Sequence, residues 1–318
     1  MNTSAGSPDP VFLVNQRSGG QAGRSVARIL AARCGSERVF DLEKTSPQAL
    51  ADRFAGTETP LIAAGGDGTV VSLLEAAWQH AERTRTRPCP VGVVPLGTGN
   101  DLASVAGWPV GAGHQGRLEW ALAGLNQGHQ AWIDRWVLRG PGLCRAWYNY
   151  CSWGSDARIA RHFDRLRCHH PKLFRNRILN KAIYVTLGLS DVAPPLTLEA
   201  PGLVVPPWTR ALVAANIHRY AGGGLLQGVD AQDGQIDLLA MGPGLAMGLA
   251  SRGVRQPKRV GRVPGFTLHL RRAVPMQLDG EPLVVRPGRW QVEHAGRALL
   301  AVYPSAELGA AEHGGPAA

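Results

Sequence analysis

Residues Leu61–Thr69 read LIAAGGDGT, a short apolar run that passes directly into a glycine-rich loop. A helix-like segment, Val70–Ala81, follows the loop. Glycines let the backbone approach a ligand closely, and the N–H groups at the start of a helix favour an anion there. The stretch therefore predicts a strand, a phosphate-binding turn and a helix, in that order.

The same pattern occurs three times in the first 110 residues. Val11–Asn15 leads into RSGGQAG and the helix-like Arg24–Arg33, and Val91–Val94 leads into PLGTGN and Asp101–Ala106. Three strand–loop–helix units predict an α/β domain with a parallel sheet, whose loops meet along one edge. A single loop of this kind is often a plain tight turn, but three in register favour a common ligand site.

Asp67 makes the prediction of a phosphate site more specific. A carboxylate beside a triphosphate is repelled unless a divalent cation lies between them, so Asp67 indicates Mg²⁺ as well as ATP. The sequence contains no G-x-x-x-x-G-K-[ST], no H-R-D and no D-F-G motif. The P-loop and protein-kinase mechanisms are therefore excluded.

The second half of the chain is rich in short β-like runs separated by turn signals. This pattern is typical of an antiparallel sandwich or barrel, and we predict a mainly antiparallel β-sandwich. The runs are Trp132–Leu138, Ala146–Cys151, Arg210–Asn216, Ile236–Met241, Phe266–Leu270 and Pro282–Arg286. We predict an α/β nucleotide-binding domain over residues 10–134 plus about 298–306, a β-rich second domain over 135–297, and loose termini at 1–9 and 308–318.

Composition and charge restrict the compartment and the partners. The chain of 318 residues is 44% hydrophobic and carries a net charge of +10, so its surface should attract polyanions. Its five cysteines are scattered without a C-x-x-C pair, which favours a reducing cytoplasm. The N-terminus lacks the features of a signal peptide, and Leu238–Ser251 is too short to span a bilayer. We expect a cytoplasmic protein with peripheral membrane contact.

GGDGT at Gly65–Thr69 together with PLGTGND at Pro95–Asp101 resembles the diacylglycerol kinase catalytic family. Sphingosine kinases and NAD kinases share GGDGT, but four later segments follow the order of the bacterial soluble lipid kinases. These are YNYCSWGSDA at Tyr148–Ala157, ANIHRYAGGGL at Ala215–Leu225, DAQDGQID at Asp230–Asp237 and LDGE at Leu278–Glu281. The resemblance covers about Phe12–Tyr303 and implies a first domain like that of NAD kinases.

The resemblance implies a catalytic role for Asp279-Gly280-Glu281. Glu281 would take the proton of a lipid hydroxyl as it attacks the γ-phosphate, with Asp279 and Asp67 as the other catalytic carboxylates. By spacing alone, D-G-E after a strand is more often a hairpin turn. The presence of the other family motifs favours the catalytic role over a plain hairpin turn.

The resemblance also implies two magnesium sites. Asp67, Asp101 and Asp134 would form a water-linked network at the domain junction, although Asp101 alone suits a helix N-cap and Asp134 alone a strand carboxylate. A second, structural site would use Asp230, Asp233 and Gln235, with a D-G turn that binds nothing as the alternative.

For ATP, the resemblance assigns residues from all three glycine loops and one from a fourth segment. They are Asn15, Gln16, Arg17, Ser18, Gly19, Thr45, Gly65, Gly66, Asp67, Gly68, Thr69, Val70, Val71, Gly97, Thr98 and Asn100. Gln16 stands where the family commonly has proline, and Val71 where it often has asparagine. These departures concern nucleotide affinity rather than the class of reaction.

Ala157–Lys181 is a strongly basic insertion, with eight basic residues against one acidic residue. Ile159, Phe163 and Leu166 recur among them at helical spacing, which is typical of a helix on an anionic membrane; a solvated basic face is the alternative. No recognition motif favours nucleic acid as a partner. We also expect a homodimer.

The reaction predicted from these features is ATP- and Mg²⁺-dependent phosphorylation of a lipid hydroxyl, with diacylglycerol as the default acceptor. Three alternatives stay open at this point. Another lipid alcohol, such as a sphingoid base, ceramide or monoacylglycerol, would keep the mechanism. An NAD kinase or a non-catalytic lipid-binding regulatory protein would change it.

Overall fold

The computed structural model describes residues 9–19, 22–96, 100–108, 118, 129–169, 196–200, 202–222, 224–242 and 256–303, with side chains in the first helix of the basic insertion described to residue 162. The chain divides into two compact units. Among the described residues, the first unit comprises those up to Ile133 and those from Arg297 to Tyr303, and the second comprises Asp134–Gly296. In the described part, no helix has the length and apolar character needed to cross a membrane.

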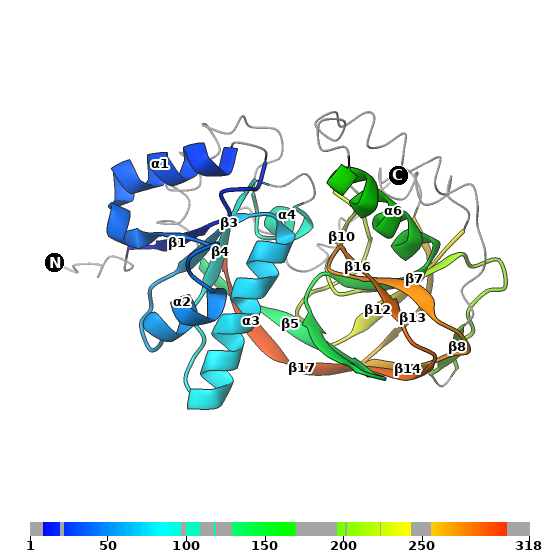
Figure 1. The fold of residues 1–318 in the computed structure, drawn as a ribbon. Coiled ribbons are helices and arrows are strands. Elements are labelled where there is room, and N and C mark those ends of the chain that lie inside the picture. Colours follow the sequence, from blue (N-terminus) through cyan, green and yellow to red (C-terminus); the bar gives the residue numbers. More distant parts are fainter. Residues whose placement is uncertain are drawn as a thin grey trace, which may run out of the picture. The chain divides into compact units, whose positions relative to one another are not determined.

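The first unit is built on a parallel sheet (Figure 1). Its strands lie in the order β2 (Val39–Asp41), β1 (Val11–Val14), β3 (Leu61–Gly65), β4 (Val91–Pro95) and the last part of β17 (Gly288–Val302). β1, β3 and β4 are buried along their whole length, as expected for a parallel sheet covered on both faces. The predicted α/β domain is confirmed.

The helices of the first unit follow the strands. They are α1 (Ala22–Cys34), the 3₁₀ turn η1 (Ser36–Arg38), α2 (Pro47–Arg53), α3 (Asp67–Thr84) and α4 (Asp101–Val105). The sequence patterns did not predict β2 or α2. β2 has only three residues, each partly exposed, so it lacks the apolar run that marks the other strands.

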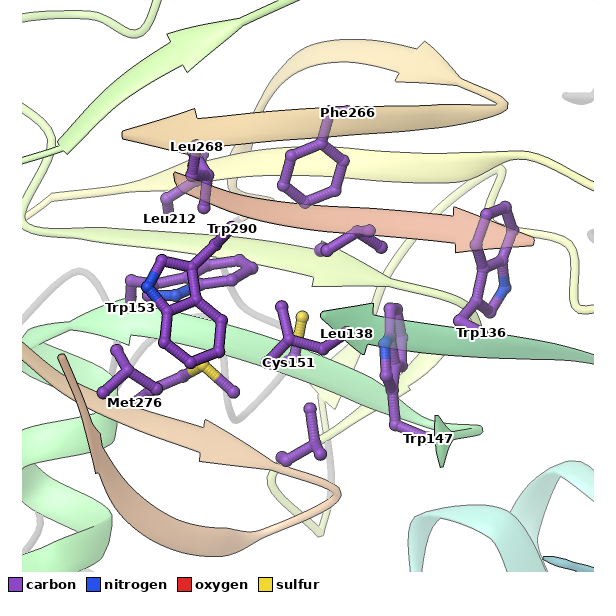
Figure 2. Close-up of a cluster of buried hydrophobic side chains, with 14 of the residues drawn as sticks. Trp136, Leu138, Trp147, Cys151, Trp153, Leu212, Phe266, Leu268, Met276 and Trp290 are labelled. Atoms are coloured by element: carbon purple, nitrogen blue, oxygen red, sulfur yellow. The ribbon is translucent and has the colours of Figure 1, made fainter. Parts of the chain in front are cut away.

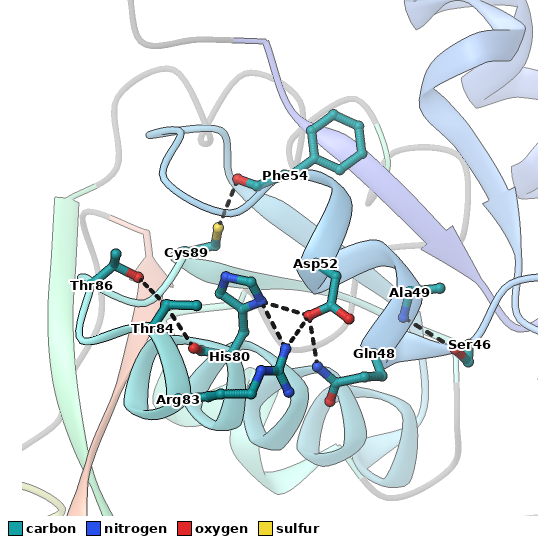
Figure 3. A network of polar contacts seen from close by, with 10 residues as sticks. All are labelled: Ser46, Gln48, Ala49, Asp52, Phe54, His80, Arg83, Thr84, Thr86 and Cys89. Atoms are coloured by element: carbon teal, nitrogen blue, oxygen red, sulfur yellow. Dashed lines mark hydrogen bonds and ion pairs between the residues drawn. The ribbon is translucent and has the colours of Figure 1, made fainter.

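A polar network joins α2 to α3 (Figure 3). One carboxylate oxygen of Asp52 accepts hydrogen bonds from Gln48 Nε2 (3.0 Å) and Arg83 Nη2 (2.8 Å), and it lies 2.5 Å from His80 Nδ1. These bonds, above all the one with His80, hold the pKa of Asp52 below its ordinary value. The Ser46 hydroxyl caps α2 by accepting the N–H of Ala49 (3.1 Å).

The second unit is an antiparallel sandwich, which confirms the predicted fold class. One sheet has the order β13 (Lys258–Val263), β12 (Ile236–Met241), β9 (Ala211–Ala215), β7 (Tyr150–Gly154), β15 (Val274–Leu278) and β16 (Glu281–Val285). The other contains β17, β14 (Gly265–Leu270) and β8 (Leu196–Glu199), with β5 (His129–Gly140) paired to β6 (Leu143–Trp147). β10 (Arg219–Tyr220) and β11 (Gly224–Leu225) form a separate hairpin.

The core of the second unit lies between these two sheets and is rich in tryptophan (Figure 2). Trp136 and Trp147 stack with their ring centroids 6.1 Å apart, while Trp153 meets Phe266 edge to face at 5.9 Å. Trp290 from β17 is also buried in this core. Each of these large rings fills space that a smaller side chain would leave as a costly cavity.

One predicted strand is wrong in detail. Ala146–Cys151 is divided between β6 and β7, with Tyr148 and Asn149 forming a bend between them. The backbone N–H groups of these two residues turn toward the Asp279 carboxylate instead of a neighbouring strand. After β7 the chain enters helix α6 (Ser155–His169), the start of the basic insertion.

Candidate active site

The loop after β1 is a tight turn at the carboxyl end of the sheet. The side-chain oxygen of Asn15 accepts the N–H of Arg17 (3.1 Å), and the Ser18 N–H donates to the Asn15 carbonyl (3.0 Å). Gly19 has a left-handed φ of 64°, and a Cβ there would lie 2.6 Å from the carbonyl oxygen of Leu96. The first loop therefore packs on the chain after β4 in a way that only glycine allows.

The loop after β3 passes into α3 without a side-chain cap. Gly66 occupies the N-cap position, and the N–H of Thr69 donates to its carbonyl (2.9 Å). A Cβ on Gly65 would lie 2.4 Å from Thr69 Oγ1, so glycine is required there too. The start of α3 is the positive end of the helix dipole, which favours an anion such as phosphate.

Asp67 begins α3 and reaches the next loop. Its carboxylate accepts the backbone N–H of Asp101 at 3.0 Å, and Asp101 itself is buried at the start of α4. The two aspartates thus lie together. Asn100, not Asp101, holds the N-cap position of α4, so the alternative role of Asp101 as a cap is wrong by one residue.

The loop after β2 lies at the same edge of the sheet. β2 is parallel to β1 with Asp41 paired to Val14, and Thr45 follows this strand, donating its N–H to the Asp41 carbonyl (2.8 Å). Arg17 of the first loop forms an ion pair with Glu43 of this loop. Four loops therefore meet at one edge; Gly97 and Thr98 lie outside the described residues.

The two valines assigned to ATP differ in exposure. The side chain of Val70 is fully buried among core residues, whereas Val71 on the next position of α3 is only partly buried. The N–H of Val70 donates to the Gly66 carbonyl at 3.3 Å. Neither the side chain nor the N–H of Val70 is therefore open to a nucleotide.

The Asp279-Gly280-Glu281 segment is a tight turn between β15 and β16. Asp279 and Gly280 both have left-handed backbones, with φ values of 48° and 85°. The Asp279 carboxylate accepts the N–H groups of Tyr148 (3.0 Å), Asn149 (2.7 Å) and Tyr150 (3.3 Å). The turn predicted from spacing alone is present, and a carboxylate anchors it to the bend between β6 and β7.

The carboxyl group of Asp279 is enclosed although the residue is partly exposed. Burial raises the pKa of Asp279 to about 7, against the lowering effect of the three backbone N–H groups and of the Arg145 charge. Burial and the charge of Asp279 also raise the pKa of the neighbouring Cys151 thiol well above its ordinary value. Asp279 is thus placed as an anchor rather than as a freely accessible base.

Glu281 lies in the opposite environment. Its side chain is 54% exposed, and its carboxylate forms an ion pair with the guanidinium of Arg145 in β6. An exposed carboxylate can meet the hydroxyl group of a substrate, while the arginine restricts its orientation. Within the second unit, the turn therefore presents one accessible carboxylate beside one enclosed carboxylate.

Asp134 in β5 is fully buried in the second unit. One of its carboxylate oxygens accepts the N–H of Gly234 (2.6 Å), and the other lies 3.2 Å from His294 Nε2. Its backbone N–H donates to the carbonyl of Ala231 (2.7 Å). Asp134 thus fixes the loop that contains Asp233, while Asp67 and Asp101 belong to the first unit.

The predicted second magnesium segment forms two short side-chain turns. Asp230 accepts the N–H of Gln232 (2.9 Å) and Asp233 accepts the N–H of Gln235 (2.8 Å). Asp233 also lies 3.4 Å from the guanidinium of Arg262. Burial raises the pKa of Asp233, and the nearby charges of Asp230 and Asp134 act in the same direction.

The two predicted magnesium segments fit the requirements of Mg²⁺ unequally. Among the described residues, no three His, Cys, Asp or Glu side chains form a group that could hold a metal ion. Mg²⁺ bound with a nucleotide needs only one or two carboxylates, because water and phosphate supply its other ligands. Asp67 and Asp101 fit this requirement, whereas the pairing of Asp233 with Arg262 makes the second segment a poorer fit.

The described part of helix α6 supports only part of the predicted membrane-binding face. Ile159 is buried against the protein, so it does not belong to an apolar face turned to lipid. Arg158 and Arg161 are partly exposed. The side chains of Phe163 and Leu166, and the rest of the insertion to Lys181, lie outside the described part.

Several residues that shape the site carried no recognisable signal. Arg145 lies in a β-strand and His294 in the long strand β17, where charged residues are ordinary. Asn216 stands within a motif already quoted, but its role appears only in the structure. Its side-chain amide donates to the carbonyls of Asp134 (3.0 Å) and Tyr148 (2.5 Å), linking β5 to the bend that anchors Asp279.

Two family models match the chain. Residues 9–134 match the diacylglycerol kinase catalytic domain, and residues 146–282 match the diacylglycerol kinase accessory domain. Together they cover both units and most of the described residues.

Relatives and solved structures agree with these matches. Human diacylglycerol kinase theta is 30% identical over 90% of this chain, and diacylglycerol kinase 2 of Arabidopsis thaliana is 27% identical over 91%. The chain spans only 34% and 45% of their lengths. The crystal structure of a diacylglycerol kinase from Bacillus anthracis str. Sterne matches 96% of this chain and 100% of its own with a TM-score of 0.63. At 14% identity, that match establishes the fold.

Proposed function

Because the chain belongs to the diacylglycerol kinase family, we propose that it transfers the γ-phosphoryl group of ATP to a lipid hydroxyl, with diacylglycerol as acceptor and phosphatidic acid as product. The observation that carries the proposal is the turn at Asp279-Gly280-Glu281. It presents an exposed carboxylate on a backbone that an enclosed carboxylate anchors. This arrangement suits a residue that must accept a proton at a fixed position.

In the proposed mechanism, the first unit binds the nucleotide. The N–H groups at the start of α3 and the tight turns at Asn15–Gly19 and Gly65–Thr69 would receive the phosphates. Asp67 and Asp101 would hold Mg²⁺, which neutralises charge on the transferred phosphate when it is bound. In this proposal the first unit orients ATP and takes no part in the proton transfer.

The second unit supplies the base. The lipid hydroxyl oxygen attacks the γ-phosphorus while the bond to the β-γ bridging oxygen breaks, and ADP leaves. The hydroxyl proton passes to the Glu281 carboxylate. Arg145 would direct that carboxylate through its ion pair, and Asp279 would hold the turn through the N–H groups it accepts.

A comparison of two glutamates tests the assignment of the base. Glu281→Gln should lower kcat by about 10²–10⁴-fold, the usual contribution of a general base. Glu293 offers a matched control, because it is also partly exposed and paired with an arginine, Arg139, at 2.5 Å. Glu293→Gln should keep nearly all activity. The measurement is phosphate transfer from labelled ATP to diacylglycerol in mixed micelles with Mg²⁺.

The outcomes separate the parts of the proposal. Full activity of Glu281→Gln would remove this residue as the base but leave the kinase. A panel of other lipid alcohols and NAD, run beside diacylglycerol, identifies the acceptor. If the unsubstituted protein phosphorylates none of them, the proposed kinase function is wrong.

We further propose that the protein acts from the cytoplasmic face of a membrane and that the basic insertion contacts anionic lipid. Each basic residue near such a surface contributes about 1 kcal/mol, so Arg158→Gln with Arg161→Gln should weaken vesicle binding by about 30-fold. Arg24→Gln with Arg28→Gln on α1 removes the same charge elsewhere and should leave binding unchanged.

Cosedimentation with phosphatidylserine vesicles measures both variants. Equal binding by the two would place the contact outside α6. The expected homodimer stays a prediction that sedimentation equilibrium of the free protein tests.

A further inference from the structure

A chain of buried polar groups connects the start of α6 to the Asp279–Glu281 turn. The Asp156 carboxylate, in the first turn of α6, accepts the Ser152 hydroxyl (2.5 Å) and the Gln277 side-chain amide (3.1 Å) on one oxygen. Its other oxygen accepts the Tyr220 hydroxyl (2.6 Å). The amide oxygen of Gln277 then accepts the backbone N–H of Gly280 (2.7 Å).

The hydrogen-bond partners of the Gln277 side chain fix the orientation of its amide group. The NH₂ group of Gln277 faces Asp156, because its Nε2 donates to a carboxylate oxygen of Asp156 that also accepts the Ser152 hydroxyl. The amide oxygen is thereby turned toward Gly280. Asp156, Ser152, Gln277 and Tyr220 are each at least 97% buried, so water does not compete for these bonds.

The turn has little else to fix it at Gly280. This residue is exposed, and no atom lies within 4 Å of the position that a Cβ would occupy. Its neighbour Asp279 has a left-handed φ of 48°, a backbone that is unfavourable for a residue other than glycine. Hydrogen bonds, rather than packing, therefore hold the backbone from which Glu281 projects.

We propose that Gln277, oriented by Asp156, is a positioning residue for Glu281. Its bond to the Gly280 N–H anchors the turn at a second point, next to the Asp279 carboxylate, and so fixes the direction in which the Glu281 carboxylate points. The proposal rests on the proposed kinase function. Neither Gln277 nor Asp156 touches the reacting atoms in this role.

Gln277→Met tests the role, because methionine keeps the length of the side chain and removes both hydrogen bonds. We expect kcat to fall by about ten- to a hundredfold with little change in the KM for ATP or lipid, as for a misplaced catalytic group. Ser152→Ala removes another buried hydrogen bond to the same Asp156 oxygen, and it should keep kcat. A similar loss of kcat in Ser152→Ala would show a general structural effect and overturn the proposal.

A second pair of variants changes Asp156, at the other end of this series of hydrogen bonds. Asp156→Leu removes the acceptor and should lower kcat as Gln277→Met does. Asp156→Asn keeps an acceptor oxygen and should recover most of that loss, because the Tyr220 hydroxyl can accept from the new NH₂ group. A folded Asp156→Leu variant with full kcat would contradict the proposal.

A double-mutant cycle shows whether Gln277 acts through Glu281. In a Glu281→Ala background, Gln277→Met should have no further effect on the residual rate, whereas equal losses in both backgrounds would overturn the proposal.

Hydrogen exchange at the Gly280 amide supplies a readout independent of activity. Exchange should accelerate in Gln277→Met and stay slow in Ser152→Ala. If the protein phosphorylates no acceptor, the kinase function fails, but this exchange difference still tests the contact.

Discussion

Asp279 and Glu281 are separated by one residue, yet their carboxylates have opposite surroundings. The first accepts three backbone N–H groups in an enclosed position, and the second is 54% exposed and paired with Arg145. The left-handed backbone of Asp279 and Gly280 turns the chain between them. Two carboxylates of the same motif can thus divide the tasks of anchor and base.

The raised pKa of Asp279 predicts a specific dependence of stability on pH. Burial raises this pKa from 3.8 to about 7, so between these values the folded protein keeps a proton that the unfolded chain releases. The free energy of unfolding should therefore fall as pH rises through this window and level off above it. Urea unfolding between pH 4.5 and 8 measures the slope.

Asp279→Asn provides the comparison for this slope. Asparagine tolerates the left-handed backbone and keeps an acceptor oxygen for the N–H groups, but it does not titrate. The part of the slope that Asp279 causes should disappear in this variant. Identical slopes in both proteins would show that Asp279 does not titrate in this range.

At the residue scale, the motifs predicted which residues lie close together in the site, but not which side chains fix their positions. Asp67 and Asp101, 34 positions apart, meet as parallel-sheet loops should. Arg145 and Gln277 were not foreseen. Their partners lie in other segments, so their roles depend on strand pairings and packing that no local pattern encodes.

At the scale of elements, the C-terminus of α3 is held in an unfavourable conformation. Arg85 is its C-cap and has a left-handed φ of 56°, while its N–H donates to the carbonyl of Ala81. Glycine adopts this backbone without the cost of a Cβ. Arg85→Gly should therefore raise the free energy of unfolding by about 0.5–1 kcal/mol.

Arg87→Gly serves as the control, because Arg87 lies two residues later, outside the helix and outside the left-handed region. That change should leave the stability unchanged or lower it through added freedom of the unfolded chain. Chemical denaturation of both variants decides the matter. A loss of stability in Arg85→Gly would mean that side-chain contacts of Arg85 outweigh its backbone cost.

Elements with a strong apolar pattern were predictable and short or polar ones were not. β1, β3 and β4 are fully buried runs followed by glycine loops, and each was foreseen. β13, with the sequence KRVGRV, is largely exposed at a sheet edge and gives no comparable signal. The division between β6 and β7 was hidden because a distant carboxylate, Asp279, causes it.

At the scale of the whole molecule, the first unit is completed by the other end of the chain. Leu300 of β17 pairs in parallel with Val91 of β4. Tyr303 then donates its hydroxyl to the Val93 carbonyl (3.1 Å) and packs edge to face on Trp108 at 5.4 Å. The sequence predicted a returning strand near residues 298–303, and its apolar run explains why it could be recognised.

Truncation tests how much the first unit depends on this strand. A chain that ends at Gly296 loses the partner of β4 and the buried Tyr303 ring, whose removal alone should cost about 3–5 kcal/mol. We expect amides of β4 to exchange rapidly in this variant. A chain that ends at Tyr303 is the control and should protect β4 as the full chain does. Equal protection in both would show that β4 needs no neighbour on that side.

The returning strand also has a consequence for how the protein is made. β4 leaves the ribosome about 200 residues before the end of β17. At ordinary rates of translation this interval lasts about 10–40 s. Throughout it, the nascent first unit has an open sheet edge that other chains can pair with. Protection of that edge during synthesis, by chaperones or by slow collapse of the partial sheet, therefore belongs to the requirements of this fold in the cell.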